Sequence, residues 1–219
     1  MTWIKICGMT SAAAVSAALE ARVDALGFVF ARSPREVTPE AAARLAQSAR
    51  GRAICVAVTR HPDQHVIDEI VRVFRPDLLQ TDVDDLSQLR LPGELSVLPV
   101  LRGWKAEGAP KARDGSRAES IWTDERGALP ERVLFEGQAS GAGVIGDWSA
   151  ARLVARRTQL VLAGGLNPAN VGQALAEVRP HGVDVSSGVE SSPGVKSPAE
   201  IERFVAAVRR GAQAAPPNR

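Results

Sequence analysis

The sequence predicts an α/β protein with a single domain, built as an eight-stranded parallel (β/α)8 barrel. Eight short runs rich in Val, Ile, Leu or Phe alternate with longer amphipathic stretches, and such alternation indicates a parallel sheet with helical crossovers. The length of 219 residues lies at the short end of the range of this TIM-barrel architecture. An open doubly wound sheet is the alternative, but no Gly-x-Gly-x-x-Gly turn follows the first run. We therefore expect a barrel over residues 1–210 and a disordered tail at 211–219.

The expected strands are short and mostly apolar, as buried parallel strands are. They are residues 3–7, 25–30, 53–58, 77–80, 96–101, 132–136, 159–163 and 182–186. Helical patterns lie between them, at residues 11–21, 39–48, 63–74, 148–155, 168–177 and 198–209. Three of these helices begin with a capping side chain followed by Pro, at Thr38-Pro39, Asn167-Pro168 and Ser197-Pro198. Residues 103–130 show little helical periodicity, so we expect an irregular crossover there, after the fifth strand.

Composition excludes several functional classes. The formal net charge is only +2, aromatic residues make up 4% and Tyr is absent, so we expect no nucleic-acid partner. The two cysteines exclude a disulfide scaffold and fit a reduced, cytoplasmic setting. No apolar run approaches the roughly 20 residues of a membrane helix, and a strand pattern begins at once, so we expect neither membrane insertion nor a signal peptide. His and Cys show no metal-ligand spacing, so we expect no metal site.

The first strand should bring Lys5 and Cys7 into the barrel. Side chains alternate along a strand, so Lys5 and Cys7 share one face, and Ile4 and Ile6 take the face toward the helices. Cys7 ends the strand, and barrels of this type carry their active sites at the carboxyl ends of the strands. A nearby ammonium lowers a thiol pKa from its usual value of about 8.5, so Lys5 should favour a Cys7 thiolate. Cys55 lies inside an apolar strand and is interpreted as a core residue.

Two further charged residues stand at the same rim. Glu136 closes the sixth strand, and a carboxylate at the end of an apolar strand is costly unless it has a task or a partner. Glu136 is therefore a candidate general acid, with an ion pair to Lys5 as the alternative or additional explanation. Arg35 follows the second strand, where a guanidinium can hold a substrate carboxylate.

The last two strands end in small residues that suit a phosphate. Gly164-Gly165 precede a capped helix after the seventh strand, and Ser186-Ser187-Gly188 follow the eighth. Backbone N–H groups beside helix starts bind anions, and barrels often bind phosphate in these two loops. The pair of loops predicts a phosphate-binding site.

Four segments resemble phosphoribosylanthranilate isomerases, in the order found in that family. They are Lys5-Ile6-Cys7-Gly8-Met9-Thr10; Gly27-Phe28-Val29-Phe30 with Ser33-Pro34-Arg35; Gly164-Gly165-Leu166-Asn167-Pro168; and Asp184-Val185-Ser186-Ser187-Gly188-Val189-Glu190. The resemblance runs from the first strand to the last helix. It implies a (β/α)8 enzyme of tryptophan biosynthesis that needs no cofactor. It also implies the Amadori rearrangement of a small phosphoribosyl substrate, N-(5-phosphoribosyl)anthranilate, by general acid–base catalysis.

The resemblance also assigns roles to residues. It makes Cys7 the catalytic base and places the catalytic acid, usually Asp, at Glu136. It implies substrate binding by a set of residues around them: Lys5, Arg35, Asp184, Gly164, Gly165, Ser186, Ser187 and Gly188. Two segments depart from the family, with Val144 where Lys is usual and Gln80-Thr81-Asp82-Val83 where Gln-Leu-His-Gly is usual.

Two other functions stay open at this point. Lys5 would serve an aldolase that forms a Schiff base with a sugar phosphate. The altered residues at Glu136 and Val144 would suit a barrel that binds phosphoribosyl compounds without turnover. We rank the isomerase ahead of both, as a monomer or a homodimer.

Overall fold

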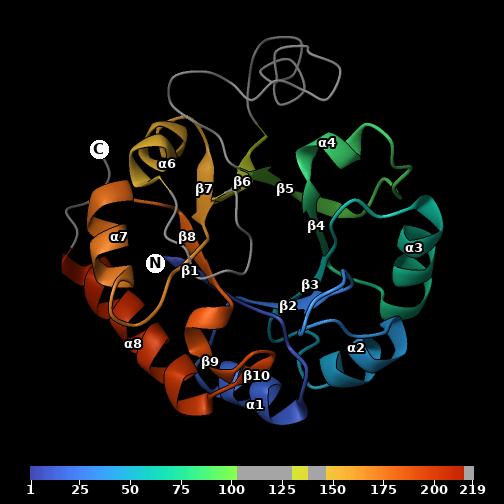
Figure 1. The fold of residues 1–219 in the computed structure, drawn as a ribbon, viewed down its shortest axis with the longest axis horizontal. Coiled ribbons are helices and arrows are strands. Elements are labelled where there is room, and N and C mark those ends of the chain that lie inside the picture. Colours follow the sequence, from blue (N-terminus) through green and yellow to red (C-terminus); the bar gives the residue numbers. More distant parts are fainter. Residues whose placement is uncertain (103–129, 138–146, 215–219) are drawn as a thin grey trace.

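A computed structural model describes residues 1–102, 130–137 and 147–214. Eight parallel strands form a closed barrel in which each strand pairs with the next and β8 pairs with β1 (Figure 1). The strands are β1 (Trp3–Cys7), β2 (Ala25–Val29), β3 (Ile54–Val58), β4 (Leu78–Asp82), β5 (Ser96–Arg102), β6 (Arg132–Glu136), β7 (Gln159–Leu162) and β8 (Gly182–Val185). The predicted fold class is confirmed, and all eight expected strands are present, with ends that differ from the expected ones by at most two residues.

Helices surround the barrel on its outside (Figure 1). They are α1 (Ala12–Glu20), α2 (Pro39–Ala46), α3 (Gln64–Glu69), α4 (Val83–Leu86), α6 (Trp148–Ala155), α7 (Val171–Val178) and α8 (Pro198–Ala214). Two short turns of other helix types occur, a π-helical turn η1 (Ile70–Phe74) and a 3-10 turn η2 (Ser187–Val189). A small antiparallel hairpin, β9 (Glu190–Ser192) and β10 (Val195–Lys196), follows η2.

The helices differ from the predicted ones in four places. The expected helix at 63–74 changes to a π-helical turn at Ile70, and α4 and the hairpin have no apolar periodicity that would predict them. The Asn167 side chain accepts hydrogen bonds from two following N–H groups as a cap would, but the α-helix begins only at Val171. The last helix continues to Ala214, because Gly211 lets it pack closely against α7. Most of the expected crossover, all of the tail beyond residue 214, and Val144 lie outside the described residues.

Strand alternation divides the core into two layers, as expected from the sequence. Ile4 and Ile6 belong to the large cluster between strands and helices, whereas Trp3 belongs to a smaller cluster inside the barrel. The inner cluster also holds one or two residues from most other strands: Ala25, Val56, Leu78, Leu98, Val100, Leu134, Val161 and Ala163. These apolar residues fill the lower barrel, so the polar inward positions near the carboxyl ends of the strands form the site.

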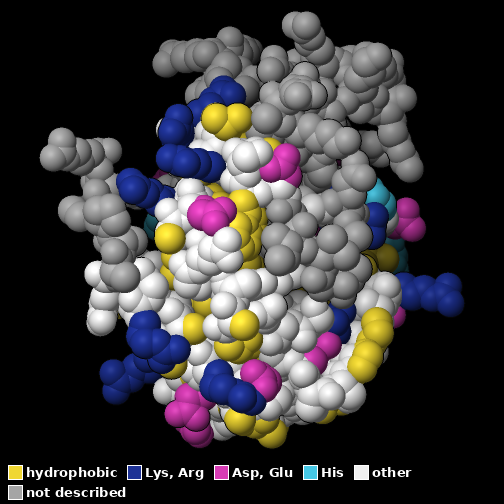
Figure 2. Space-filling model, turned by 60° about the vertical axis from the view of Figure 1, so that its left-hand side comes forward, with side chains coloured by type: hydrophobic (Ala, Val, Ile, Leu, Met, Phe, Trp, Pro, Cys, Tyr) yellow, Lys and Arg dark blue, Asp and Glu magenta, His cyan; other side chains and the backbone are white. Residues whose placement is uncertain are grey.

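The surface carries mixed charge. On the face drawn in Figure 2, acidic side chains lie among the basic ones, in keeping with the small net charge. In the part of the chain that the structure describes, no helix has both the length and the apolar character needed to cross a membrane.

The packing of α8 leads to a stability prediction. Phe204 of α8 is fully buried between the helices and the barrel. Phe204→Ala should lower the free energy of unfolding by about 3–5 kcal/mol, because it removes buried surface and leaves a cavity. The neighbouring, exposed Glu202→Ala should change it by less than about 0.5 kcal/mol. Urea unfolding monitored by circular dichroism measures both, and equal effects would contradict this account of the core.

Candidate active site

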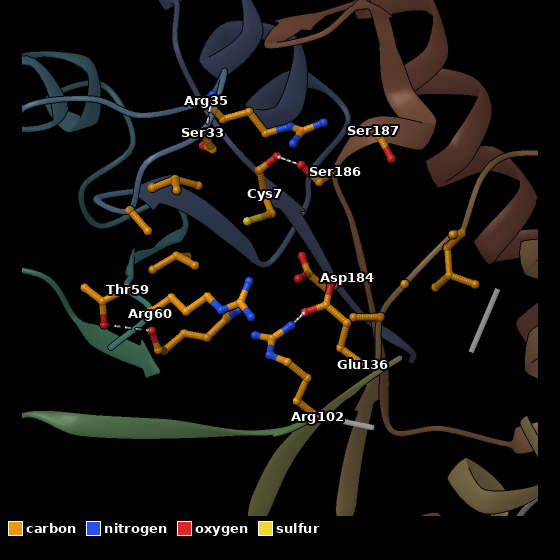
Figure 3. A pocket seen from close by; sticks show the side chains of 18 of the residues that line it. Cys7, Ser33, Arg35, Thr59, Arg60, Arg102, Glu136, Asp184, Ser186 and Ser187 are labelled. Carbon is orange, nitrogen blue, oxygen red and sulfur yellow. Dashed lines mark hydrogen bonds and ion pairs between the residues drawn. The ribbon is translucent and has the colours of Figure 1, made fainter. Parts of the chain in front are cut away.

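The carboxyl ends of the strands surround one cavity, into which most of the predicted site residues project (Figure 3). Among its lining residues are Cys7, Arg35, Arg60, Gln80, Arg102, Glu136, Gly164, Gly165, Asp184, Ser186 and Ser187. Of the predicted residues, Lys5 and Gly188 are not part of this lining. Lys5 lies fully buried beneath the cavity, and Gly188 packs against the loop after β7.

Lys5, which is buried beneath the cavity, forms an ion pair with Asp184 in the cavity wall. The Lys5 Nζ lies 2.9 Å from Asp184 Oδ1, and the two residues stand opposite each other where β1 pairs with β8. The expected pair between Lys5 and Glu136 is therefore wrong, because Asp184 on the adjacent strand is within direct reach. Burial alone would lower the pKa of Lys5, but attraction to Asp184 and Cys7 outweighs it, and the pKa is raised. Lys5 thus keeps its proton.

Cys7 projects into the cavity from the end of β1 (Figure 3). Its side chain fits because Gly27 on the neighbouring strand has none: a Cβ there would lie 2.9 Å from the Cys7 Sγ. Burial raises the pKa of the Cys7 thiol, and this outweighs the lowering by Lys5 and Lys196. Lys5 lowers the thiol pKa, as expected from the sequence, but burial, with a smaller contribution from Asp184, acts in the opposite direction, so the net shift does not favour the thiolate.

Glu136 lies across the cavity from Cys7 and is held by Arg102 (Figure 3). The Arg102 Nη1 donates to Glu136 Oε2 at 2.6 Å, while its Nη2 and Nε donate to Asp82 Oδ1 at 2.7 and 3.0 Å. The three residues end β5, β6 and β4, which are neighbours in the barrel. Sequence reasoning missed Arg102, although an arginine that ends an apolar strand next to the Glu136 strand was a signal that could have revealed it.

Arg35 reaches the cavity from the loop after β2, as predicted, but its guanidinium is already bound. Its Nε and Nη2 donate to the two carboxylate oxygens of Glu190 at 2.7 and 2.9 Å. Glu190 was quoted only as part of a motif in the sequence, and its position two residues after Gly188 gave no signal of this contact. The bidentate pair uses one edge of the guanidinium and leaves Nη1 without a partner among the described residues.

The two small-residue loops come together as predicted. Gly164 and Gly165 have φ angles of 90° and 66°, a region that favours glycine. Their N–H groups donate to no other group of the described chain. A Cβ at Gly188 would lie 1.9 Å from the carbonyl oxygen of Leu166, so the loop after β8 sits directly against the loop after β7. The η2 turn that starts at Ser187 adds a second set of helical N–H groups on the same side of the cavity.

One grouping near the rim has the ligand types of a metal site. His61, Asp82 and Asp85 place ligand atoms within 4.8 Å of one another. The His61 Nδ1 already contacts Asp85 Oδ1 at 2.8 Å, and the guanidinium of Arg102 occupies Asp82. Both carboxylates are therefore already engaged by protein side chains, so the grouping by itself carries no argument for a metal.

Comparison with known proteins agrees with this geometry. A family model described as N-(5'phosphoribosyl)anthranilate (PRA) isomerase matches residues 4–207. The chain belongs to this isomerase family. Curated relatives of that name include one from Allorhizobium ampelinum, 38% identical over 97% of this chain and 96% of its own, and one from Rhizobium rhizogenes, 39% identical over 94% and 93%.

Solved structures of the family have the same fold. The phosphoribosyl anthranilate isomerase of Thermotoga maritima superposes with a TM-score of 0.76 at 30% identity, covering 96% of this chain and 100% of its own. A further structure of the family, in complex with reduced 1-(o-carboxyphenylamino)-1-deoxyribulose 5-phosphate, gives a TM-score of 0.72 at 29% identity, with the same coverage. The Thermotoga maritima isomerase has been described as dimeric; for the present chain, monomer or homodimer stays a prediction.

The raised pKa of Cys7 leads to a prediction for this member of the family. In a Cys55→Ala variant, Cys7 is the one remaining cysteine of the chain. Its alkylation by iodoacetamide should have a midpoint above pH 8.5, the ordinary value being about 8.5, because the buried thiol resists ionisation. The control is Cys7→Ala, in which Cys55, with a pKa raised to about 11, should react only in strong alkali. A Cys7 midpoint below pH 8 would contradict the prediction.

Proposed function

We propose that the chain converts N-(5-phospho-β-D-ribosyl)anthranilate into 1-(2-carboxyphenylamino)-1-deoxy-D-ribulose 5-phosphate, an Amadori rearrangement of tryptophan biosynthesis. The observation that carries the proposal is a thiol and a carboxyl group, Cys7 and Glu136, that face each other across one cavity in a chain of this family. The same cavity offers backbone N–H groups for a phosphate and a guanidinium for a carboxylate.

The reaction needs one acid and one base. The acid gives a proton to the ring oxygen, the C1′–oxygen bond breaks, and the nitrogen lone pair forms a C1′=N iminium. The base then removes the C2′ proton, and the C2′–H electrons form the C1′=C2′ bond of an enolamine. Tautomerisation to the ketone completes the isomerisation. No hydride leaves and no oxidant is consumed, so the chemistry requires no cofactor.

Glu136 is the proposed acid and Cys7 the proposed base. In its protonated form, Glu136 keeps Oε2 as the acceptor from Arg102 and uses the other oxygen to donate toward the ring oxygen. The Arg102 guanidinium, anchored on Asp82, fixes the rotamer of the glutamate side chain, which is one methylene longer than the usual aspartate. Cys7 acts as thiolate, and its raised pKa means that the proton must leave before or during substrate binding.

The other side chains bind parts of the substrate. Asp184 lies in the cavity wall, where its carboxylate can accept from a ribose hydroxyl. Gln80 offers a buried Oε1 without a hydrogen-bond partner among the described residues, and a substrate hydroxyl or amine would satisfy it. Gly164, Gly165 and Ser187 present N–H groups to the phosphate, and Gly188 keeps their two loops in contact.

The Schiff-base alternative is disfavoured by the position of Lys5. An aldolase needs a free amine in the substrate cavity, whereas Lys5 is fully buried, holds its proton and is paired with Asp184. Borohydride treatment with a sugar phosphate should therefore leave Lys5 unmodified. A reducible adduct at Lys5 would favour the aldolase instead.

Turnover separates the isomerase from a barrel that only binds. The chain should restore growth of a tryptophan auxotroph that lacks this isomerase, and the purified protein should isomerise the substrate. Cys7→Ser should lose kcat by several orders of magnitude and still bind the reduced product analogue, because the change removes only the ionisable thiol. Near-normal turnover by Cys7→Ser would refute Cys7 as the base, and no turnover by the unmodified protein would favour the binding module.

The acid is tested by Glu136→Gln. The amide keeps the shape and the contact with Arg102 but has no proton to transfer, so kcat should fall by about 10²–10⁴ with little change in analogue affinity. The matched control is Glu136→Asp, which restores the usual residue of the family and should remain active. Wild-type turnover by Glu136→Gln would move the role to another group, and Asp184→Asn would then be the next variant to measure.

A further inference from the structure

Glu190 and Lys196 are two buried charged residues that the proposed reaction does not use. Their side chains are 5% and 0% exposed, and the Lys196 Nζ lies 2.6 Å from Glu190 Oε1. Glu190 also binds the Arg35 guanidinium through both oxygens. Burying an ammonium and a carboxylate is costly, and the cost is recovered only when every polar atom finds a partner.

The pair connects Arg35 to the backbone at Cys7. Lys196 also donates to the carbonyl oxygen of Ser186 at 3.0 Å and to its hydroxyl at 3.3 Å. The Ser186 hydroxyl in turn donates to the Cys7 carbonyl oxygen at 3.0 Å, a contact drawn in Figure 3. A continuous series of hydrogen bonds therefore runs from Arg35 through Glu190, Lys196 and Ser186 to the strand end that carries the thiol.

The hairpin β9–β10 fixes this series in place. Its turn residue Gly194 accepts from the Thr10 hydroxyl at 2.8 Å and donates its N–H to Glu190 Oε2 at 3.3 Å. A Cβ at Gly194 would lie 2.3 Å from the carbonyl oxygen of Pro34, so the hairpin also rests directly on the loop that carries Arg35. The hairpin therefore contacts the loops after β1 and after β2 at once.

The positive charge of Lys196 gives this residue a role beyond holding the hairpin in place. Arg35 and Glu190 alone would form a neutral pair with little attraction for a substrate carboxylate. Burial alone would raise the pKa of the Glu190 carboxyl. Hydrogen bonds from Arg35 and Lys196 outweigh this effect, so the pKa is lowered. Glu190 therefore stays ionised next to Arg35 and Lys196. Burial lowers the pKa of Lys196, while the hydrogen bond and the attraction to Glu190 oppose that lowering; with Lys196 protonated, the group of three carries one positive charge in excess.

We propose that Glu190 and Lys196 are positioning residues. Glu190 orients the guanidinium of Arg35. Lys196 keeps one positive charge in excess at that end of the cavity, and this charge attracts the substrate carboxylate and stabilises the Cys7 thiolate. The choice of ligand and of base rests on the proposed function. The charged groups around Cys7 are Lys5 on its own strand, Asp184 on β8, Lys196 on β10 and Arg35 in the loop after β2. Lys5 is paired with Asp184, whereas Arg35 and Lys196 share the single carboxylate of Glu190, so the excess positive charge lies on the hairpin side.

The test uses the pH at which iodoacetamide alkylates Cys7, in the Cys55→Ala background. Lys196→Met removes a cation and should move the midpoint upward by about one pH unit, a tenfold change in thiolate population at a given pH. Glu190→Gln removes an anion and should move it downward. Lys196→Arg keeps the charge and should leave it in place. Loosened packing would expose the thiol and move both variants down toward its ordinary value, so an unchanged or lowered midpoint in Lys196→Met would overturn the proposal.

Ligand binding supplies a second readout. Calorimetry would compare the reduced product analogue with the same compound lacking the ring carboxylate. Lys196→Met should weaken the first about tenfold, a loss of about 1.4 kcal/mol, and the second less than twofold. Equal weakening of both ligands would overturn the role in carboxylate binding. Neither readout needs turnover, so an inactive protein that shows both shifts would refute the proposed isomerase alone.

Discussion

The ion pair between Lys5 and Asp184 lies where the barrel closes, and the site depends on it. The two residues face each other across the pairing of the first and last strands; Lys5 lies beneath the cavity that holds Cys7, and Asp184 lines it. Either charge alone would be expensive at this depth, because an unpaired buried ion loses its hydration without compensation. Only the closed barrel brings together residues that are 179 positions apart in the sequence. The closure of the barrel and the pairing of these two charges therefore depend on each other.

This pairing contributes to the raised pKa of Cys7, although a lysine lies beside the thiol. A lysine two residues away on the same strand face suggests activation of the thiol, but the Lys5 ammonium is matched by a carboxylate that acts on the thiol in the opposite direction. Burial has the largest effect on the thiol pKa and Asp184 adds to it, and together they outweigh the lowering by Lys5 and Lys196. The thiolate then needs a positive charge from elsewhere. Arg35 and Lys196 are the cations placed to supply it.

The sequence was informative about everything that alternation and strand order determine. Eight strands, the inward face of β1 and the meeting of the glycine loops after β7 and β8 all follow from periodicity and from the rule that parallel strands end at one rim. The ion-pair partners of the charged residues did not follow from these rules. Lys5 pairs with Asp184 rather than Glu136 because the register between β1 and β8 places Lys5 opposite Asp184. This register cannot be read from the sequence. Arg102 and Lys196 were not predicted, because each contacts a carboxylate that lies 34 or 6 residues away in the sequence, and these contacts form only in the folded barrel.

The remaining charges give the cavity two unlike ends. On the Cys7 side, Arg35 and Lys196 share one carboxylate, Glu190, so positive charge is in excess. On the opposite side, Asp82 and Glu136 share one guanidinium, that of Arg102, so negative charge is in excess. Arg60 comes no closer than 3.9 Å to Asp82, and half of its side chain is in solvent, so water screens its charge. A thiol loses its proton more readily near positive charge, so the end that holds Cys7 suits a base. The other end holds the carboxyl group of Glu136 in a fixed position across the cavity from that thiol, which is the arrangement that an acid and a base working on one sugar require.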